Sequence, residues 1–469
     1  MTRGAETQQS REQQVIVGMR LRGEIVPVGV LFVQRNVSDT LDRSTGRFRY
    51  AASYLSRPNA IPLDPVRIPL KAAEFRFAKF GGLPSAIRDA GPDRWGRTLI
   101  ERCRQAGGHK GPLAELDYLL ASPRDRAGNL HFAVDFDGAG APRWDRLALE
   151  PESIKGMDEV REAVKGVLRR PDPASHRIFP DSWKALLTGS GGARPKINLQ
   201  ARDGTYLVKM ANPVSDVSAN ARIETASLAM ASIVGIEVTG VSARGAQAGS
   251  DLVAVRRFDV CPDGRRLQMV SAMTVLDADD APYKRENWSY PLLAIELDRW
   301  SSQPAKDKEQ LYRAMVLRAM LSDADDHPRN YALICDPDEA ASAGSTLGRW
   351  RLSPMYDSVA GLGAGRRASE LAMEIGDRGF EVSRENMLSR CETFGLTHER
   401  ASQIIDMIET TVLDRFEAVM RESGVPEKDI ALTMTAVVPL DARPRENAVQ
   451  LLLDRMNGQS DAPADAPPR

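Results

Sequence analysis

The chain of 469 residues is long enough for two or three domains, and its 42% hydrophobic and 27% charged residues are typical of a globular protein with a sizeable core. Its 63 Lys and Arg nearly balance its 64 Asp and Glu, which excludes the strongly basic field of a stand-alone nucleic-acid-binding protein. The four cysteines form no C-x-x-C pair, which argues against a zinc site and a disulfide framework and suits a reducing cytoplasm.

The two ends of the chain differ in composition from the rest. Residues 1–14 are polar and lack the apolar stretch of a secretion signal, and residues 458–469 are rich in Pro, Ala and Asp, so both are expected to be disordered. No apolar run between them approaches the ~18 residues of a membrane helix. The sequence therefore predicts a cytoplasmic protein without a membrane span.

The first third of the chain predicts a small β-rich unit. Residues 15–33 are patterned as two short strands and a turn, and residues 48–55 and 129–136 as further strands. Asp93 is a candidate cap for a helix from Trp95 to Cys103, followed by a second helix at 113–120. The segment PDRWGR is either a contact surface or a helix start with Trp95 in the core. An amphipathic helix is predicted at 157–168, and a domain boundary near 171–180.

A glycine-rich turn, TGSGGARPK at 188–196, precedes the strand KINLQ. Glycines let backbone N–H groups approach phosphate oxygens, and Arg194 and Lys196 would add positive charge. Such turns are more often simple hairpin loops. Phosphate binding and a plain hairpin both remain open from this segment alone.

The next elements follow the order of a protein kinase. The strand at 205–210 carries Lys209 near its end, as in the V-A-I-K strand whose lysine reaches the nucleotide phosphates. The helix predicted at 218–234 places Glu224 in its first turns, where it is either the ion-pair partner of Lys209 or an acid favoured near a helix N-terminus. The buried strand at 251–259 turns polar where a kinase has the hinge that contacts adenine.

The loop LSDADDHPRN follows a helix predicted at 308–321. Asp325 and Asn330 stand five positions apart, which is the Asp-to-Asn spacing of the kinase catalytic loop, and Asp357 follows as a later lone acid. In that arrangement one carboxylate accepts the proton of the attacking hydroxyl, while the amide and the later acid hold Mg²⁺. Taken alone, the loop is equally well a solvated turn.

A metal-dependent hydrolase is an alternative for this loop, with His327, Asp323, Asp325 and Asp326 as ligands of a transition metal. That alternative leaves Lys209 and the glycine-rich turn unexplained. After the loop, a strand at 331–335, a flexible hairpin insert at 335–348 and a strand at 350–354 are expected. Helical periodicity dominates residues 384–456.

The sequence also resembles the HipA-type toxin kinases of bacterial type II toxin–antitoxin systems. The matching segments, from about Gly29 to about Gly376, are FRYAASYL, GGLPSAIRDAGPDRWGR, GSGGARPK, YLVKM, GIEV, VRRFD, DADDHPRNYAL, LSPMYD and ELAMEIG. The combination of GGARPK with D-x-H-x-x-N and PMYD is specific to that family.

This resemblance implies an α+β, kinase-like two-lobed fold with a small β-rich N-terminal subdomain and an all-helical C-terminal lobe. The expected bounds are 15–175 for a HipA-like N-terminal subdomain, 176–270 for a kinase-like N-lobe with the glycine-rich loop, and 271–457 for the helical C-lobe. It implies a serine/threonine protein kinase that uses ATP and Mg²⁺.

The resemblance also implies roles for individual residues. Asp325 would be the catalytic base with His327 beside it, Asn330 and Asp357 would hold Mg²⁺, and Lys209 would contact the ATP phosphates. The other expected ATP-binding residues are Ser190, Gly191, Gly192, Ala193, Arg194, Lys196, Glu224, Arg256 and Phe258.

Regulation and partners are likewise implied by the resemblance. Autophosphorylation in the glycine-rich loop is expected at Ser190, with Thr188 as second choice. The loop sequence T-G-S-G-G departs from the family pattern. Arg256 is a second departure, because an acidic residue is frequent at that position in the family. The expected substrate is a translation component such as an aminoacyl-tRNA synthetase. Its phosphorylation is expected to cause growth arrest or persistence. A HipB-like helix-turn-helix antitoxin is the expected partner, and DNA would be contacted only through it. In a non-enzymatic alternative, the chain is a non-catalytic partner or co-repressor of that antitoxin.

Overall fold

The computed structural model describes the greater part of the chain. The described residues are 12–37, 42–58, 60–109, 111–150, 162–164, 166–167, 186, 194–210, 219–244, 252–279, 284–342, 349–363, 365 and 367–442. Several predictions fall wholly or largely outside them: the two disordered ends, the helix at 157–168, the boundary at 171–180 and the end of the helical region. Thr188, Ser190, Gly191, Gly192 and Ala193 of the glycine-rich loop are also outside.

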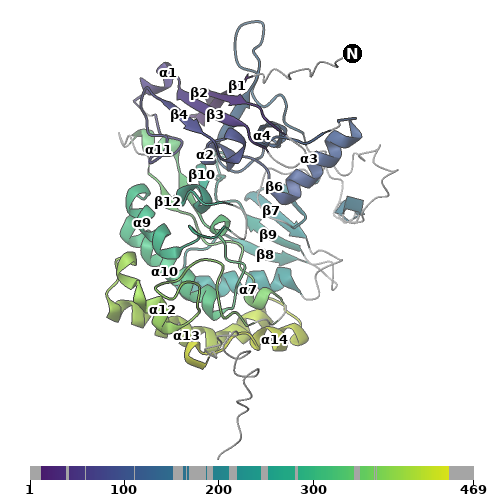
Figure 1. Ribbon diagram of the computed structural model, residues 1–469. Coiled ribbons are helices and arrows are strands. Elements are labelled where there is room, and N and C mark those ends of the chain that lie inside the picture. Colours follow the sequence, from purple (N-terminus) through teal and green to yellow (C-terminus); the bar gives the residue numbers. More distant parts are fainter. Residues whose placement is uncertain are drawn as a thin grey trace, which may run out of the picture.

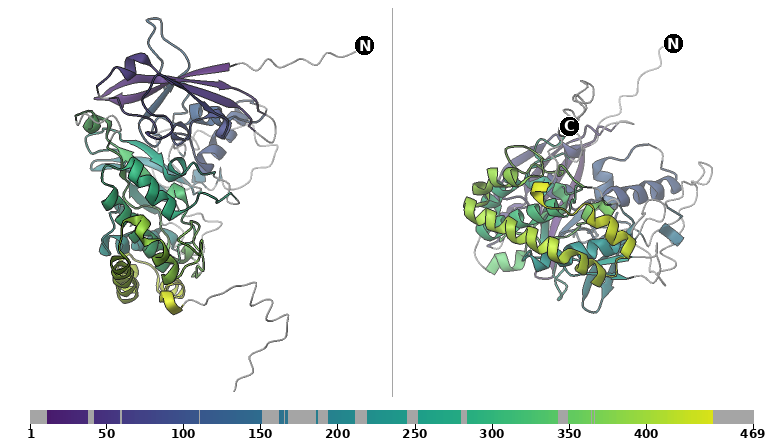
Figure 2. Two further views of the ribbon diagram at one scale, coloured as in Figure 1. Left: turned by 60° about the vertical axis from the view of Figure 1, so that its left-hand side comes forward. Right: turned by 90° about the horizontal axis from the view of Figure 1, so that it is seen from below.

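A five-stranded antiparallel sheet forms one end of the molecule (Figures 1 and 2). Its strand order is β4 (Glu74–Phe77), β3 (Thr45–Tyr50), β2 (Glu24–Gln34), β1 (Glu12–Leu21) and β5 (Leu130–Ala133). The apolar residues of β1 and β2 that the sequence alternates lie in the core, among them Val15, Val17 and Leu31. The predicted hairpin and the strand after it are therefore present.

The third strand ends earlier than predicted. β3 stops at Tyr50, and residues Ala52–Leu55 form a helical turn, α1, instead of continuing the strand. The reason is the burial of Tyr54, whose hydroxyl donates to the carbonyl of Ile61 at 2.9 Å and accepts from its N–H at 3.1 Å. A strand continued through Tyr54 would not bring the ring into this position.

Three short helices follow, α2 (Ser85–Arg88), α3 (Arg94–Ala106) and α4 (Glu115–Ala121). Asp93 caps α3 as predicted, because its carboxylate accepts from the N–H of Gly96 at 3.0 Å. Trp95 is buried, in a second core cluster with Leu99, Ile197 and Val208. α3 therefore covers one face of the next sheet.

That next sheet has four antiparallel strands in the order β6 (Lys196–Ala201), β7 (Gly204–Met210), β9 (Leu252–Arg256) and β8 (Val241–Arg244). Helix α7 (Asn220–Ile233) packs on the face opposite α3, where Ala221 contacts Val253 and Val255. The sheet is thus enclosed between α3 and α7, and Figure 1 shows α7 between the sheet and the helices at the far end.

The remaining lobe is mainly helical. Its helices are α8 (Ala272–Val275), α9 (Tyr290–Trp300), α10 (Pro304–Met320), α12 (Arg384–Ser389), α13 (His398–Glu422) and α14 (Glu427–Met434). A small sheet of β10 (Gln268–Ser271), β11 (Ala332–Cys335) and β12 (Arg351–Leu352) lies beside them. The predicted α+β, two-lobed fold class is confirmed. The insert at 335–348 differs from the expected hairpin, because Pro337–Ser342 forms helix α11.

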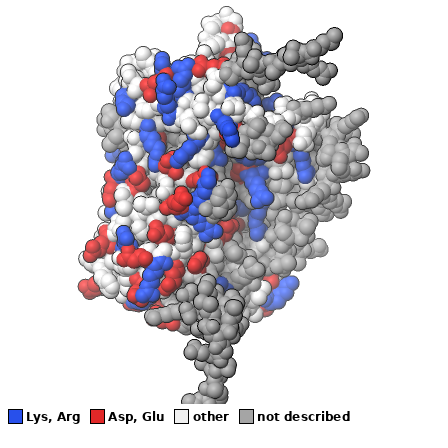
Figure 3. Space-filling view, in the orientation of Figure 1, with Lys and Arg blue, Asp and Glu red and all other residues white. Residues whose placement is uncertain are grey.

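The surface of the molecule agrees with its composition. Acidic and basic side chains are interspersed over the face in Figure 3. Among the described residues, no helix combines the length and apolar character needed to cross a membrane.

Candidate active site

The loop after α10 is shaped by a sharp exit from the helix. α10 ends at Met320, and Ser322 has a φ of 53°, which L-residues rarely adopt. The Ser322 hydroxyl donates to the carbonyl of Ala436 at 2.8 Å, and the Asp323 N–H donates to the carbonyl of Arg318 at 2.9 Å. These bonds hold the start of the loop against the helical lobe.

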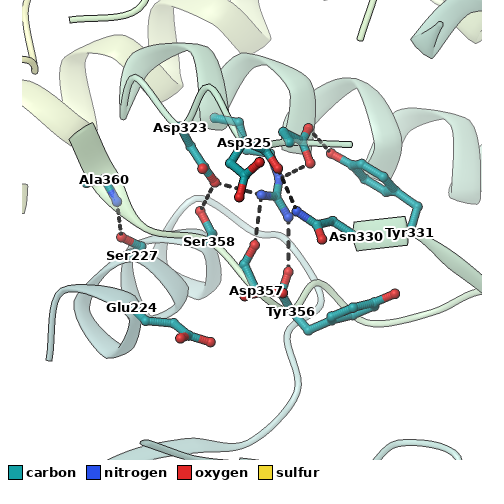
Figure 4. Close-up of polar contacts among 12 residues, drawn as sticks. Glu224, Ser227, Asp323, Asp325, Asn330, Tyr331, Tyr356, Asp357, Ser358 and Ala360 are labelled. Carbon is teal, nitrogen blue, oxygen red and sulfur yellow. Dashed lines mark hydrogen bonds and ion pairs between the residues drawn. The ribbon is translucent and has the colours of Figure 1, made fainter. Parts of the chain in front are cut away.

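Arg318, on the last turn of α10, joins this loop to the segment that carries Asp357. Its side chain is fully buried. Nη1 lies 2.6 Å from Asp323 Oδ2 and donates to the carbonyl of Asp357 at 3.0 Å, while Nη2 donates to the carbonyl of Tyr356 at 3.0 Å (Figure 4). Sequence reasoning missed this role, since nothing local distinguishes Arg318 from other basic residues of a helix.

Two of the four acidic or imidazole groups proposed for a transition metal are occupied elsewhere. Asp323 accepts from the hydroxyl of Ser358 at 2.8 Å besides Arg318. Asp326 is fully buried, lies 3.1 Å from Arg318 Nε, and accepts from the hydroxyls of Tyr290 and Tyr331. Burial raises the pKa of Asp326 well above its ordinary value. Within the described part of the chain, no group of three His, Cys, Asp or Glu is placed to hold a metal, so the hydrolase alternative does not fit.

Asp325 differs from its neighbours because its side chain is exposed. Its backbone carbonyl accepts from the Asn330 amide nitrogen at 3.2 Å and from the His327 N–H at 3.0 Å. The bond at the Asn330 nitrogen leaves the amide oxygen of this buried side chain available as a cation ligand. Figure 4 shows Asp325 and Asn330 facing the segment with Tyr356 and Asp357.

His327 lies beside Asp325 in the loop, with its ring edge-to-face against Trp288 at a centroid distance of 6.3 Å. Its Nδ1 is buried and has no hydrogen-bond partner among the described residues. The ring is close enough to Asp357 to help lower the pKa of that carboxyl. No direct bond joins His327 to the Asp325 carboxylate in the described contacts.

Lys209 lies between two carboxylates. Its Nζ is 2.7 Å from Glu224 Oε1 and 2.7 Å from Asp357 Oδ1. The predicted Lys209–Glu224 ion pair is therefore confirmed, and the contact with Asp357 joins the two lobes. Asp357 has a φ of 57°, a conformation that costs energy for a non-glycine residue and is held here by the bond from Arg318.

The sharing of Lys209 between Glu224 and Asp357 influences the pKa values of all three groups. Burial opposes the charge on Lys209, but Asp357 and Glu224 outweigh it and raise the lysine pKa above its ordinary value. Burial also opposes ionisation of Asp357, yet Lys209, with Lys196 and His327, holds the Asp357 pKa well below its usual range. Burial raises the pKa of Glu224, and the nearby Asp357 charge acts in the same direction, while Lys209 acts to lower it. Asp357 is thus the carboxylate that stays ionised most strongly.

Lys196 is directly opposite Lys209 in the β6–β7 pairing. It is 1% exposed, and its Nζ lies 2.9 Å from Asp93 Oδ2, so an acid of the first third of the chain reaches the site. Arg194 is near enough to Glu224 to help lower the pKa of that acid. The sequence identified Asp93 as a helix cap but carried no signal for its second contact.

The two expected hinge residues have different surroundings. Phe258 packs against Tyr356, with ring centroids 5.2 Å apart. Arg256 pairs with Tyr206 in the β7–β9 register, while Lys209 pairs with Val253. Since side chains alternate along a strand, Arg256 points to the face opposite Lys209, where it donates to the carbonyl of Asp203 at 2.9 Å. The Arg256 side chain therefore does not join Lys209 and Asp357, and only its backbone could contact a nucleotide.

The donor set is suited to Mg²⁺. The candidate ligands are the carboxylate of Asp357 and the amide oxygen of Asn330, which are hard oxygen donors, and Lys209 adds a cation for phosphate oxygens beside them. No sulfur or imidazole ligand is needed. The residues present fit a nucleotide bound with Mg²⁺.

Comparisons with known proteins agree with this arrangement. A family model described as the HipA-like C-terminal domain matches residues 188–416. The "Putative kinase Y4mE" of Sinorhizobium fredii is 22% identical over 352 residues, which cover 71% of this chain and 76% of the relative. The fold also matches the solved Shewanella oneidensis MR-1 toxin–antitoxin complex of HipA, HipB and operator DNA, with a TM-score of 0.58 and 18% identity over 89% of this chain and 94% of the matched one. Residues 188–416 thus match the HipA-like C-terminal domain, and the chain has the two-lobed fold of the Shewanella HipA.

Proposed function

We propose that the chain is a serine/threonine protein kinase that transfers the γ-phosphoryl group of ATP, with Mg²⁺, to a protein hydroxyl. The observation that carries this proposal is the position of Lys209, bonded at once to Glu224 and to Asp357. In kinases the first contact orients the strand lysine, and the second acid belongs to the metal site. Both are assembled here from segments far apart in the sequence.

Each residue has a role in this chemistry. Bound ATP with Mg²⁺ supplies the phosphoryl group and the charge that neutralises its oxygens. Asn330 and Asp357 hold the metal, and Lys209 with Lys196 and the glycine-rich loop binds the phosphates. Asp325, exposed at the loop, accepts the proton of the attacking hydroxyl, with His327 beside it. Glu224 keeps Lys209 in place. Phe258 and the Arg256 backbone are the proposed hinge contacts for adenine.

The biological setting is part of the same proposal. The Shewanella HipA was solved together with HipB and its operator DNA. We infer that this chain also pairs with a HipB-like helix-turn-helix antitoxin and reaches DNA only through that partner, which agrees with its net charge of −1. It acts in the cytoplasm on a translation component such as an aminoacyl-tRNA synthetase, causing growth arrest, and limits itself by autophosphorylation at Ser190.

The test is phosphate transfer by the purified full-length chain. Wild type incubated with ATP and Mg²⁺ should gain the mass of a phosphate on itself or on an added bacterial protein extract. Asp325→Asn should reduce the rate by roughly 10²–10⁴-fold, the usual contribution of a positioned proton acceptor. Intact mass and phosphosite mapping measure both.

A matched control is Glu417→Gln, which removes an exposed acid of α13 that pairs with Arg421. This variant should transfer phosphate at the wild-type rate. If Asp325→Asn is as fast as wild type, its assigned role is wrong. If folded wild type binds no ATP and transfers nothing, the kinase proposal fails as a whole.

A further inference from the structure

The carboxylate of Asp325 depends on the backbone of its loop for its direction. Among the described residues, no hydrogen bond or ion pair reaches this exposed carboxylate. The acids that flank it, Asp323 and Asp326, are buried, and both of their carboxylates are bonded to other side chains. A proton acceptor works only within hydrogen-bond reach of the hydroxyl that it serves. The bonds of the two buried acids therefore decide where the Asp325 carboxylate lies.

Asp326 is held by groups from three places in the chain. Its Oδ1 lies 3.1 Å from Arg318 Nε, and its Oδ2 accepts from the hydroxyl of Tyr331 at 2.7 Å. Oδ2 also accepts from the hydroxyl of Tyr290, which is fully buried at the start of α9. Arg318 and Tyr331 adjoin the loop itself, whereas Tyr290 and Asp326 are 36 positions apart. Tyr290 is therefore the support that ties the loop to α9.

The segment that carries Tyr290 is itself fixed. The Tyr290 N–H donates to the carbonyl of Glu374 at 3.0 Å, and the Glu374 N–H donates to the carbonyl of Trp288 at 2.7 Å. The Trp288 ring packs edge-to-face against His327. Trp288 and Tyr290 thus contact two consecutive loop residues, His327 and Asp326, and their segment lies alongside the loop. It can hold the loop in one position because it is bonded to the chain on its other side.

The core needs the ring of Tyr290 but not its hydroxyl. The ring belongs to the main hydrophobic core and lies edge-to-face against Tyr331, with centroids 5.8 Å apart. The hydroxyl is what connects Tyr290 to Asp326. A phenylalanine would keep the packing and lose only this connection.

We propose that Tyr290 is a positioning residue for phosphoryl transfer. Its hydroxyl holds Asp326, and the peptide that Asp326 shares with Asp325 carries this constraint to the proposed proton acceptor. The inference rests on the kinase function proposed above. It adds that α9 supports the catalytic loop and acts on the rate of transfer without touching the nucleotide.

The test separates the rate of transfer from the affinity for ATP, in the full-length chain. Tyr290→Phe should lower the rate of phosphate transfer at saturating ATP and Mg²⁺ roughly tenfold, less than the ~10²-fold that a 1 Å misplacement can cost. Its ATP affinity, measured by calorimetric titration, should equal that of wild type, because the Lys209–Glu224 pair does not depend on Tyr290. A loss of rate without a loss of affinity identifies an interaction that matters in the transition state.

Asp326→Asn tests the same connection from its other end. It keeps the size of the side chain but puts an amide where hydroxyl donors converge, so it should slow the transfer at least as much as Tyr290→Phe. The double variant should be no slower than Asp326→Asn alone, because Tyr290 acts only through Asp326.

Tyr312→Phe is the matched control. Tyr312 is also fully buried in the helical lobe, but its hydroxyl donates to the backbone carbonyl of Met387 at 3.2 Å. This variant should lower the thermal midpoint about as much as Tyr290→Phe and transfer phosphate at the wild-type rate. A wild-type rate in Tyr290→Phe overturns the inference, as does an equal loss of rate in Tyr312→Phe or an additive loss in the double variant. Wild type that transfers no phosphate overturns the kinase proposal itself, and this inference with it.

Discussion

The guanidinium group of Arg318 lies at the junction of the two loops that carry Asp325 and Asp357. It is surrounded by Asp323, Asp326 and two backbone carbonyls, and no part of the side chain reaches solvent. A planar group with five donors in fixed directions can satisfy such a set, and a lysine ammonium cannot. The backbone at Asp357, with its positive φ, is held by one of these bonds.

Arg318→Lys is therefore expected to destabilise the protein by about 3 kcal/mol, because it leaves buried acids and carbonyls without donors. It should also weaken Mg²⁺-dependent ATP binding by displacing Asp357. Urea unfolding and nucleotide titration measure the two effects. Arg421→Lys, at an exposed pair on α13, should change the unfolding free energy by less than about 1 kcal/mol. Equal effects of the two substitutions would contradict the role of Arg318.

At the scale of elements, β9 illustrates how one strand serves two parts of the molecule. Its apolar residues Val253 and Val255 pack on α7, and the residues just after it turn toward the N-terminal subdomain. There Asp259 lies 2.7 Å from Arg257 and accepts from the N–H of Gly128 at 2.9 Å. The candidate hinge is thereby fixed to the first subdomain.

The contact between Asp259 and Arg257 predicts that the stability of the fold depends on pH. Burial opposes its ionisation, but Arg257, with Arg266 and the Gly128 N–H, lowers its pKa from 3.8 to about 2. Because the folded-state pKa is the lower one, this group stabilises the fold above pH ~4, and the contribution of ~2 kcal/mol is lost as pH falls toward 2.

Asp259→Asn should therefore be less stable than wild type at neutral pH, and the difference in unfolding free energy should shrink by about 2 kcal/mol between pH ~4 and ~2. Denaturant unfolding at stepped pH measures it. Asp414→Asn, an exposed acid of α13, should keep the wild-type slope. A constant difference at every pH would show that Asp259 does not titrate in this window.

At the scale of the whole molecule, the N-terminal sheet and the helical lobe share one continuous core. Val15 and Leu31 of the first sheet belong to the same hydrophobic cluster as Leu311 and Phe416 of the helical lobe. Asp89 links them as well, since it accepts from the N–H and hydroxyl of Ser271 at 2.7 and 2.8 Å and from the hydroxyl of Thr274 at 2.7 Å. Such continuity favours unfolding in one cooperative step.

Asp89→Ala is expected to lower the stability of the whole chain by about 3 kcal/mol, because it leaves three donors at a mostly buried boundary without their acceptor. The transition should remain single, by calorimetry and by fluorescence. Lys79→Met removes the exposed ion pair with Asp277 across the same boundary and should have little effect. Two separate transitions in Asp89→Ala would show that the subdomains are coupled less tightly than their shared core indicates.

The sequence by itself determined the elements whose causes are local. Strand alternation, the Asp93 cap and the helical period around Glu224 depend on residues a few positions apart, so the hairpin of β1 and β2, helix α3 and helix α7 could be predicted. The sequence also showed that the candidate site residues occur in the order of a protein kinase, because a motif is a property of the chain itself. These residues are Lys209, Glu224, Asp325, Asn330 and Asp357. The contacts among these residues could be expected only from the resemblance to known kinases.

Only the tertiary structure decided which charges are buried together. The contact of Arg318 with the Asp357 carbonyl spans 39 positions, and that of Asp93 with Lys196 spans 103. The face on which Arg256 lies depends on strand register, and the end of β3 depends on where Tyr54 finds its hydrogen-bond partner. Long-range burial outweighs local preference at each of these places, because a buried charge or hydroxyl without a partner costs more than a strand residue gains from its propensity.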